Sequence, residues 1–209
     1  MNKKRKECKR NPSFFVKEKE AFAHPVGNDI IDWETAKIQE QKLRPRALKK
    51  LFNPLEIELI QHYKSPVLAY WQLWSAKEAA YKAWQREAGV KPVFNPIAFR
   101  CQKRSESYFN VIKEDFECEV EIKTTSNYIY AVLVSETGRL VSKVFKSTSK
   151  YQNFISQLKD KGWFIEKNEN GIPYFRDKTC NTKLPVSLTH DQDWYAIQLS
   201  AYAYDLLFK

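Results

Sequence analysis

The feature that most constrains this chain is the segment Trp74–Lys82, where charged side chains interrupt a run of apolar ones. A serine cap, a proline at the first helical position and a following glycine predict a helix from Pro66 to Ala88. Its apolar residues cover most of its circumference, so the helix should pack on several faces. Glu78 and Lys82 are four residues apart and share one face. Because an unpaired buried carboxylate is costly, Glu78 requires Lys82, a metal ion or exposure to a cleft.

Composition sets the protein class. A chain of 209 residues with 43% hydrophobic residues can form one packed domain or two small subdomains. It has no apolar run of the roughly 20 residues that a membrane helix needs, and its lysine-rich start lacks the apolar stretch of a secretory signal. We therefore expect a globular, cytoplasmic protein with no membrane partner. The four cysteines are widely scattered and accompanied by three histidines, so we expect free thiols and no zinc site.

A net charge of +10 predicts an anionic partner without identifying it. Six basic residues lie in Asn2–Arg10, which we expect to form a frayed arm. A second basic cluster lies in a stretch predicted to be ordered, and is therefore the better candidate for a partner-binding surface. We call it the basic cluster; it consists of Arg44, Arg46, Lys49 and Lys50. The alternative is an ordinary solvated helix face.

The order of the predicted elements indicates an α+β protein with two related halves. A buried strand at residues 26–31 is followed by helices at 45–51, 54–63 and 66–88, then by alternating segments typical of an antiparallel meander up to Ser135. A further helix begins at residues 147–149, and strands return at 163–166, 173–175, 185–189 and 194–202. Tyr130–Ser135 and Tyr195–Ser200 share the pattern Tyr-Ala-apolar-x-apolar-Ser. We therefore predict a basic arm and lead-in at 1–25, a first half at 26–145 and a second half at 146–209, joined near Lys143–Ser149.

Four motifs resemble the signature of the 4'-phosphopantetheinyl transferase superfamily. Gly27-Asn28-Asp29 resembles its G-x-D, and Trp74–Lys82 resembles W/F-S/A-x-K-E-S/A-x-x-x-K. Asn170–Tyr174 resembles the N-G-K-P turn, while Ser187–His190 and the strand after it resemble the S-I-T/S-H segment. The resemblance implies a 4'-phosphopantetheinyl transferase-like α+β fold in which each of two similar halves packs a helix on an antiparallel sheet.

The motif order implies an architecture that differs from both family types. The small holo-acyl-carrier-protein synthases run through these motifs in the same order but are much shorter and trimeric. The larger type fuses two halves and places N-G-K-P before G-x-D. We therefore expect two fused halves in permuted order, acting as a monomer. The alternative is a small-type trimer with an insertion near residues 100–165.

The resemblance implies Mg²⁺-dependent transfer of 4'-phosphopantetheine from coenzyme A to a serine of an acidic acyl or peptidyl carrier protein, as in fatty acid biosynthesis. The leaving group is adenosine 3',5'-bisphosphate. By resemblance, Asp29 and Glu78 bind the metal, Glu78 or a water takes the serine proton, and Lys82 contacts the phosphates. Glu78 and Lys82 are thus the implied catalytic residues. Mg²⁺ suits such a pair because it accepts a few carboxylates and keeps several waters and phosphate oxygens.

The coenzyme A contacts implied by the resemblance come from three motifs: Lys77, Lys82, Gly171, Pro173, Ser187 and His190. Lys77 has a structural ion pair as its alternative, and His190 matches a histidine directed at the 3'-phosphate. Ile172 stands where the family has a lysine, and Lys178 or Lys183 could replace that cation. Ile31 stands where the larger type has a third carboxylate, so water should complete the metal's coordination; Asp32 matches an acidic position of the small type.

The basic cluster is the expected docking surface for the carrier protein. Two other functions stay open from sequence alone. One is a transferase-like fold that binds coenzyme A or a carrier protein without turnover, an alternative that the departure at Ile172 keeps open. The other is a basic single-stranded nucleic-acid-binding protein, which explains the positive charge but not Asp29 and Glu78, whose carboxylates would repel a phosphate backbone.

Overall fold

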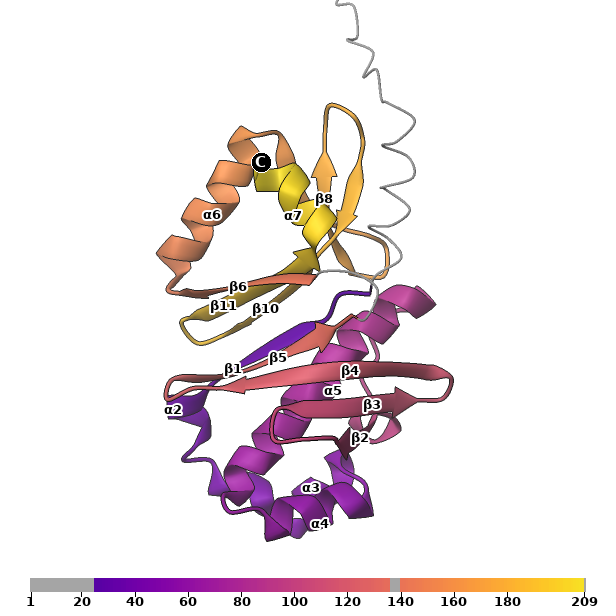
Figure 1. Cartoon of the computed structure of the whole chain (residues 1–209), viewed down its shortest axis with the longest axis vertical. Coiled ribbons are helices and arrows are strands. Elements are labelled where there is room, and N and C mark those ends of the chain that lie inside the picture. Colours follow the sequence, from indigo (N-terminus) through magenta and orange to yellow (C-terminus); the bar gives the residue numbers. More distant parts are fainter. Residues whose placement is uncertain (1–24, 136–139, 209) are drawn as a thin grey trace, which may run out of the picture.

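Two helix-and-sheet units lie one above the other (Figure 1). The computed structural model describes residues 25–135 and 140–208. The predicted N-terminal arm therefore lies almost entirely outside the described residues. Within them, no helix is both long and apolar enough to cross a membrane.

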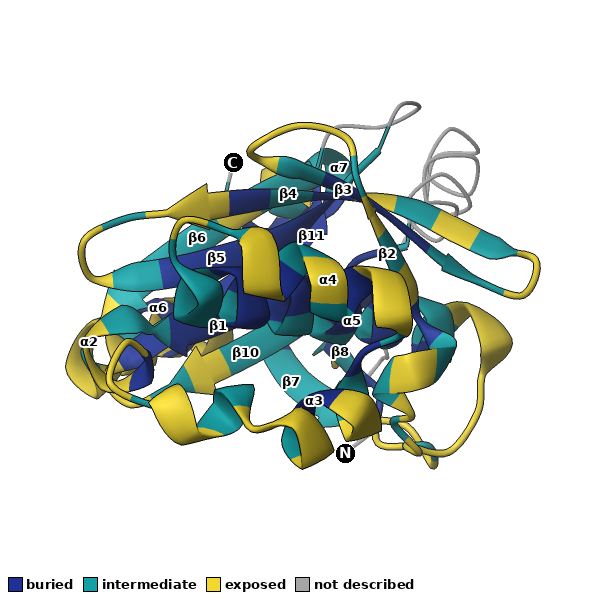
Figure 2. Cartoon of the chain, turned by 90° about the horizontal axis from the view of Figure 1, so that it is seen from below, coloured by how far each residue is buried: buried dark blue, intermediate teal, exposed yellow. Residues whose placement is uncertain are grey.

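The first unit packs one long helix, α5 (Pro66–Ala88), on a five-stranded antiparallel sheet. In spatial order, the strands are β1 (Asn28–Asp32), β5 (Tyr128–Val134), β4 (Phe116–Thr124), β3 (Tyr108–Lys113) and β2 (Arg100–Lys103). Short helices precede and follow α5: α2 (Trp33–Ala36), η1 (Glu40–Leu43), α3 (Pro45–Leu51), α4 (Pro54–His62) and η2 (Pro96–Ala98). Figure 2 shows that the middle of α5 is buried, while α3 and α4 present exposed residues on the outside.

The local signals explain where these helices begin and end. α4 starts with a capping box, in which the Asn53 side chain accepts from the Glu56 backbone and the Glu56 side chain accepts from the Asn53 backbone. α5 follows Ser65 and ends just before Gly89, whose φ of 62° is the left-handed conformation that glycine adopts readily. The predicted bounds of α5 are confirmed, although the Ser65 side chain makes no capping hydrogen bond.

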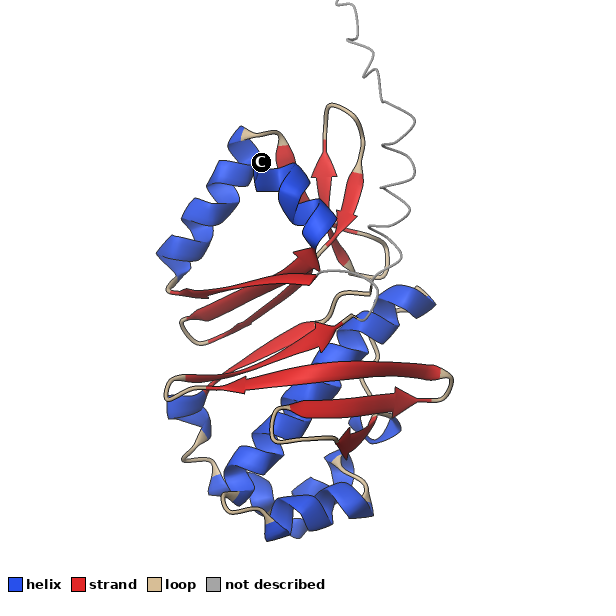
Figure 3. Ribbon diagram, in the orientation of Figure 1, coloured by secondary structure: helices blue, strands red, loops and turns tan. Residues whose placement is uncertain are grey.

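The second unit packs two helices on a three-stranded antiparallel sheet ordered β10–β11–β6. The helices α6 (Thr148–Asp160) and α7 (Ala201–Phe208) cover the face of this sheet that points away from the first unit (Figure 3). The strands are β6 (Leu140–Lys146), β10 (Ser187–Asp191) and β11 (Trp194–Ser200). A second antiparallel sheet is formed by β7 (Trp163–Lys167), β8 (Pro173–Asp177) and β9 (Lys183–Pro185).

The two units share one plan. In each, the first strand pairs antiparallel with the last strand, and the last strand pairs on its other side with the strand before it. β1, α5, β4 and β5 of the first unit thus correspond to β6, α6, β10 and β11 of the second. The predicted α+β class with two similar halves is confirmed. The division at residue 145 stays a prediction. β6 spans that residue and pairs with β11 in the second unit's sheet.

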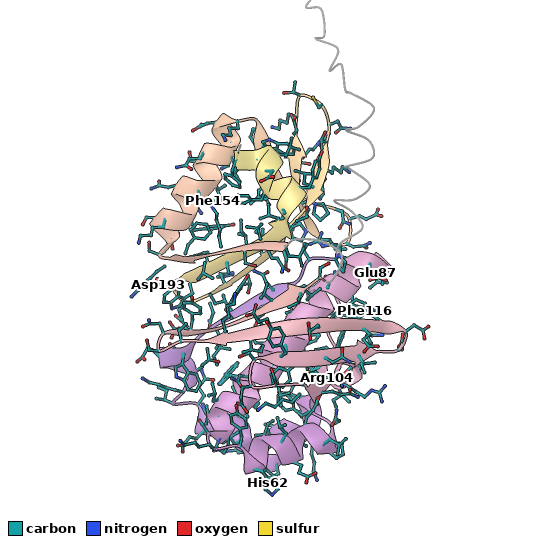
Figure 4. All side chains as sticks on the ribbon, viewed as in Figure 1. His62, Glu87, Arg104, Phe116, Phe154 and Asp193 are labelled. Atoms are coloured by element: carbon teal, nitrogen blue, oxygen red, sulfur yellow. The ribbon has the colours of Figure 1, made fainter. Side chains whose placement is uncertain are left out.

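Two elements differ from expectation. β6 occupies the segment predicted to join the halves; its Lys143 lies over aromatic rings of Phe154, Tyr204 and Phe208, which accommodates a lysine in a packed strand. Figure 4 shows Phe154 inside the second unit. The final strand stops at Ser200 instead of Tyr202, because the Ser200 hydroxyl accepts a hydrogen bond from the Ala203 backbone and caps α7.

The thiol expectation also needs correction. Cys101 and Cys118 are free, and burial raises the pKa of both thiols. Cys180, however, is disulfide-bonded.

The two units meet where β1 lies beside β10 and β11. Neighbouring residues of β11 face opposite ways. Trp194 and Ala196 pack against the first unit, in a cluster with Ile30, Tyr130 and Val132. Ile197 and Leu199 pack in the second unit's core, beneath α6 and α7. β1 and β10 belong to separate sheets, so side chains make the hydrogen bonds between them. Buried Gln198 spans the junction, accepting from the Gly27 backbone at 2.8 Å and donating to the Leu133 carbonyl at 2.8 Å.

Candidate active site

Asp29 lies on β1 at the junction of the two units and is largely buried. One carboxylate oxygen, Oδ1, accepts from Lys82 Nζ at 3.1 Å and from Thr189 Oγ1 at 3.0 Å. The other, Oδ2, accepts from Ser75 Oγ at 2.9 Å. Donors from α5 and β10 therefore hold this carboxylate in place from two sides.

Lys82 connects α5 to the motif around Asp29. Its ammonium group donates to the Asn28 carbonyl at 2.8 Å as well as to Asp29. The side chain keeps 25% of its surface exposed, compared with 10% for Asp29. This cation is therefore anchored but still accessible from solvent.

Glu78 reaches the same place from α5, one turn before Lys82. Burial and the nearby negative charge of Asp29 raise the pKa of Glu78 to about 7, although Lys82 acts in the opposite direction. Among the described residues, its carboxylate has no hydrogen-bond or ion-pair partner, and it lines a cavity together with Asp29. A cation placed beside the two carboxylates would relieve their mutual repulsion.

Gly27 sets how closely α5 approaches β1. A Cβ at this position would lie 2.1 Å from the carbonyl oxygen of Ala79. Only glycine permits this backbone approach. The glycine of Gly27-Asn28-Asp29 therefore keeps the helix that carries Glu78 and Lys82 against the strand that carries Asp29.

Two cavities meet at these side chains. The smaller, of about 390 Å³, contains Asp29 and Glu78 in its walls; the larger, of about 480 Å³, extends between the end of α5 and the second unit. The two share four lining residues: Lys82, Leu188, Thr189 and His190. Asp29, Glu78 and Lys82, predicted as one site, are thus brought together at the boundary between the cavities.

The residues predicted from the second half also reach the larger cavity. Gly171, Pro173, Ser187 and His190 all line it. Ser187 is nevertheless buried and accepts from the Asn28 backbone at 3.1 Å, so its hydroxyl also joins the two units. His190 is exposed and stacks on Tyr195, with the ring centroids 5.7 Å apart.

Lys77 does not reach the site, which corrects its prediction as a coenzyme A contact. Its ammonium group is fully buried on the opposite side of α5 and donates to Glu56 at 2.7 Å. It also donates to the carbonyls of Leu51 and Pro96. All three ammonium protons are therefore used inside the first unit, and the structural alternative holds.

Neither lysine proposed to replace the missing cation at Ile172 lines the larger cavity. Lys178 lies over the ring of Phe164 at 4.0 Å, and Lys183 lies over Tyr174 at 4.9 Å. Lys167 lines the cavity instead, from the strand position that pairs with Pro173. No local sequence signal marks Lys167, because its position depends on the register of the β7–β8 hairpin.

Arg86 is the second basic residue of the larger cavity that the motifs did not indicate. Its guanidinium donates to the carbonyls of Pro173 at 3.0 Å and Val186 at 2.7 Å. Burial lowers its pKa to about 10, and its Nε is buried without a partner among the described residues. Its position four residues after Lys82, on the same helix face, was the signal that could have found it.

The remaining predicted residues lie away from both cavities or serve local structure. All four members of the basic cluster are exposed, at or beside α3, and none lines either cavity. Asp32 caps α2 by accepting from the Thr35 backbone at 2.7 Å. Figure 4 places His62, which belongs to none of the motifs, at the outer end of the first unit.

The match to a family model decides the identity of the fold. The model of the 4'-phosphopantetheinyl transferase superfamily matches residues 25–133, more than half of the chain. The protein belongs to this superfamily. The matched region spans the first unit, with Asp29, Glu78 and Lys82, and the superfamily supports phosphopantetheine transfer as the general chemistry. A search of curated proteins found no match.

Proposed function

We propose that this phosphopantetheinyl transferase moves 4'-phosphopantetheine from coenzyme A to a serine of an acyl or peptidyl carrier protein, such as a carrier of fatty acid biosynthesis, and releases adenosine 3',5'-bisphosphate. The observation that carries the proposal is the meeting of Asp29, Glu78 and Lys82 at the boundary of two cavities. One cavity suits the nucleotide substrate, and the other gives a second substrate access to the same groups.

The larger cavity suits a polyanion. Lys82, Arg86 and Lys167 line it together with His190, and no aspartate or glutamate is among its described lining residues. Coenzyme A carries a pyrophosphate and a ribose 3'-phosphate, both of which require such positive surroundings. We place its pyrophosphate at Lys82, beside the carboxylates, and its 3'-phosphate near His190 and Lys167.

Asp29 and Glu78 fit a divalent cation. Mg²⁺ is usually held by one or two carboxylates together with waters and substrate phosphates, so two carboxylates are sufficient. The raised pKa of Glu78 supports this assignment, because a nearby cation would favour its ionised form. When bound, Mg²⁺ would neutralise charge on the pyrophosphate during transfer.

The bond changes follow from this arrangement. The carrier serine oxygen bonds to the phosphorus that bears pantetheine, and the pyrophosphate bond to the nucleotide breaks. The serine proton passes to Glu78 or to a water, while Lys82 stabilises the charge that develops on the phosphate oxygens.

The decisive experiment is intact-mass analysis of apo carrier proteins incubated with this protein, coenzyme A and Mg²⁺. We expect an added mass equal to phosphopantetheine with the wild type, and none with Glu78→Gln or with EDTA. Circular dichroism of Glu78→Gln should match the wild type. Coenzyme A binding without transfer to any carrier would instead indicate a binding protein that lacks turnover.

The basic cluster on α3 is proposed as the docking surface for the acidic carrier. Replacing Arg44, Arg46, Lys49 and Lys50 by alanine should raise KM for the carrier while leaving coenzyme A affinity unchanged. The difference from the wild type should shrink at high salt, because exposed charges are screened. Normal carrier kinetics at every salt concentration would refute this docking surface.

We further propose a cytoplasmic monomer. Both units of one chain supply contacts to Asp29, so a site between subunits is not required. Analytical ultracentrifugation tests the monomeric state, and a stable trimer would contradict it.

A further inference from the structure

The strand β10 presents every second side chain to β1. Ser187 accepts from the Asn28 backbone at 3.1 Å, Thr189 donates to Asp29 at 3.0 Å, and Asp191 accepts from the Asp32 backbone at 2.8 Å. Two of these three contacts hold backbone groups. Thr189 alone among them binds a side chain, and that side chain is the proposed metal-binding carboxylate.

The Thr189 hydroxyl fills a defined place around Asp29. Oδ1 of Asp29 accepts two hydrogen bonds, one from Thr189 and one from Lys82, whereas Oδ2 accepts one from Ser75. Ser75 and Lys82 belong to α5, so Thr189 is the donor that the second unit provides. Without it, the two donors from α5 would be left to set the orientation of the carboxylate.

Thr189 also lies at the point where both cavities meet. Its hydroxyl therefore lies beside the positions that we propose for the two substrates, and not at a remote structural position. Hydrogen bonds to a metal-binding carboxylate fix its orientation, and their loss typically weakens metal affinity by about 10–100-fold.

We propose that Thr189 is a positioning residue for Asp29, through which the second unit sets the metal affinity of the first. This inference rests on the proposed function, since it takes Asp29 as a metal-binding group. Thr189 itself contributes no atom to the transferred group. It holds Asp29 in the orientation in which Asp29 and Glu78 can share one cation.

The test compares Thr189→Val, which keeps the side-chain shape, with Thr189→Ser, which keeps the hydroxyl. Mg²⁺ binding is measured by calorimetry on the full chain with coenzyme A present, separately from transfer activity. We expect Thr189→Val to weaken Mg²⁺ binding about tenfold, and transfer by this variant to recover at high Mg²⁺. Thr189→Ser should bind Mg²⁺ like the wild type.

Thr124→Val is the control, because Thr124 is another strand threonine whose hydroxyl bonds to a side chain: it accepts from Gln72, away from the cavities. Thr124 is exposed, whereas Thr189 is half-buried. Thr124→Val should leave Mg²⁺ affinity unchanged. Equal Mg²⁺ affinity of Thr189→Val and wild type would overturn this inference but would not contradict the proposed function. Absence of Mg²⁺ binding and transfer in the wild type would instead refute the proposed function.

Discussion

Two lysines of α5, five residues apart, face opposite sides of the same helix and have opposite fates. Lys77 and its partner Glu56 are essentially inaccessible, with 0% and 1% of their side chains exposed. Lys82 and its partner Asp29 keep 25% and 10% exposed and lie at the meeting point of two cavities. Both pairs have short, well-formed contacts, so contact geometry does not distinguish a structural pair from a functional one.

The two pairs differ in solvent exposure and in whether the charged groups around them already have all their hydrogen-bond partners. Lys77 gives its protons to Glu56 and two backbone carbonyls, and Glu56 also accepts from the Cys101 backbone at 2.7 Å. That cluster is complete without a ligand. The cluster around Glu78 is incomplete without a ligand, because burial and the charge of Asp29 disfavour the ionised form of Glu78. A site prepared for a ligand is recognised by this incompleteness.

The largest expected effect comes from breaking the buried pair. Lys77→Met removes the cation beside the buried carboxylate of Glu56, and should lower the free energy of unfolding by about 3–5 kcal/mol. Urea unfolding followed by circular dichroism measures this change. Lys37→Met, which breaks the exposed pair with Glu34, is the control and should cost about 1 kcal/mol or less. Wild-type stability of Lys77→Met would show that the pair is not structurally important.

Breaking the accessible pair, Lys82 and Asp29, should reduce activity more than stability. Lys82→Met should lower kcat/KM for transfer about 100-fold or more, because a cation that stabilises developing phosphate charge is lost. Its effect on unfolding should be much smaller than that of Lys77→Met, since Lys82 is partly solvated. Paired kinetics and urea unfolding check both statements. A variant that unfolded readily but retained kcat/KM would reverse the roles we assign to the two lysines.

The raised pKa of Glu78 predicts a pH-dependent stability in the absence of metal. This pKa is about 7 in the folded protein, compared with 4.5 for an ordinary glutamate, so the folded protein holds the Glu78 proton more tightly than the unfolded chain does. The protonation of Glu78 therefore stabilises the fold fully below pH 4.5. This stabilisation is lost as pH rises through 7. With EDTA present, the Tm of the wild type should therefore fall from pH 5 to pH 8 more than that of Glu78→Gln. Parallel Tm profiles for the two proteins would contradict the assignment.

A smaller effect is expected at Lys167, which lines only the larger of the two cavities. Lys167→Ala should weaken coenzyme A binding about tenfold, the usual size of a lost hydrogen bond to a charged group. Lys178→Ala is the matched control, because Lys178 packs over Phe164 instead of lining this cavity. Calorimetric titration with coenzyme A and dephospho-coenzyme A compares the variants. If Lys167 meets the 3'-phosphate, its loss should affect binding of coenzyme A alone.

Local sequence signals were sufficient for much of the fold. The capping box at Asn53 and the left-handed Gly89 set helix bounds through contacts within a few residues, so they could be read directly. The spacing of Glu78 and Lys82 likewise placed both groups on one helix face. Ser200 gave a cap signal of the same kind for α7, but the apolar run around it was interpreted as a longer strand.

The rest depended on contacts between distant segments. Lys77 resembles a phosphate-binding lysine until its partner Glu56, 21 residues away, is seen to lie beside it. Thr189 contacts Asp29 across 160 residues, and Lys167 reaches its cavity through the register of a hairpin. Such contacts are set by packing between elements and by strand register, and no pattern within either segment specifies them.

The close contact at Gly27 provides a criterion for comparing this protein with its relatives. Any side chain there would meet the Ala79 carbonyl and push α5, with Glu78 and Lys82, away from Asp29. A relative could lose a carboxylate and still keep the shape of the site, whereas a relative with a bulkier residue at this position must have changed the spacing itself. A glycine at position 27 therefore indicates that a relative keeps the spacing of this site, just as the charged residues indicate that it keeps the chemistry.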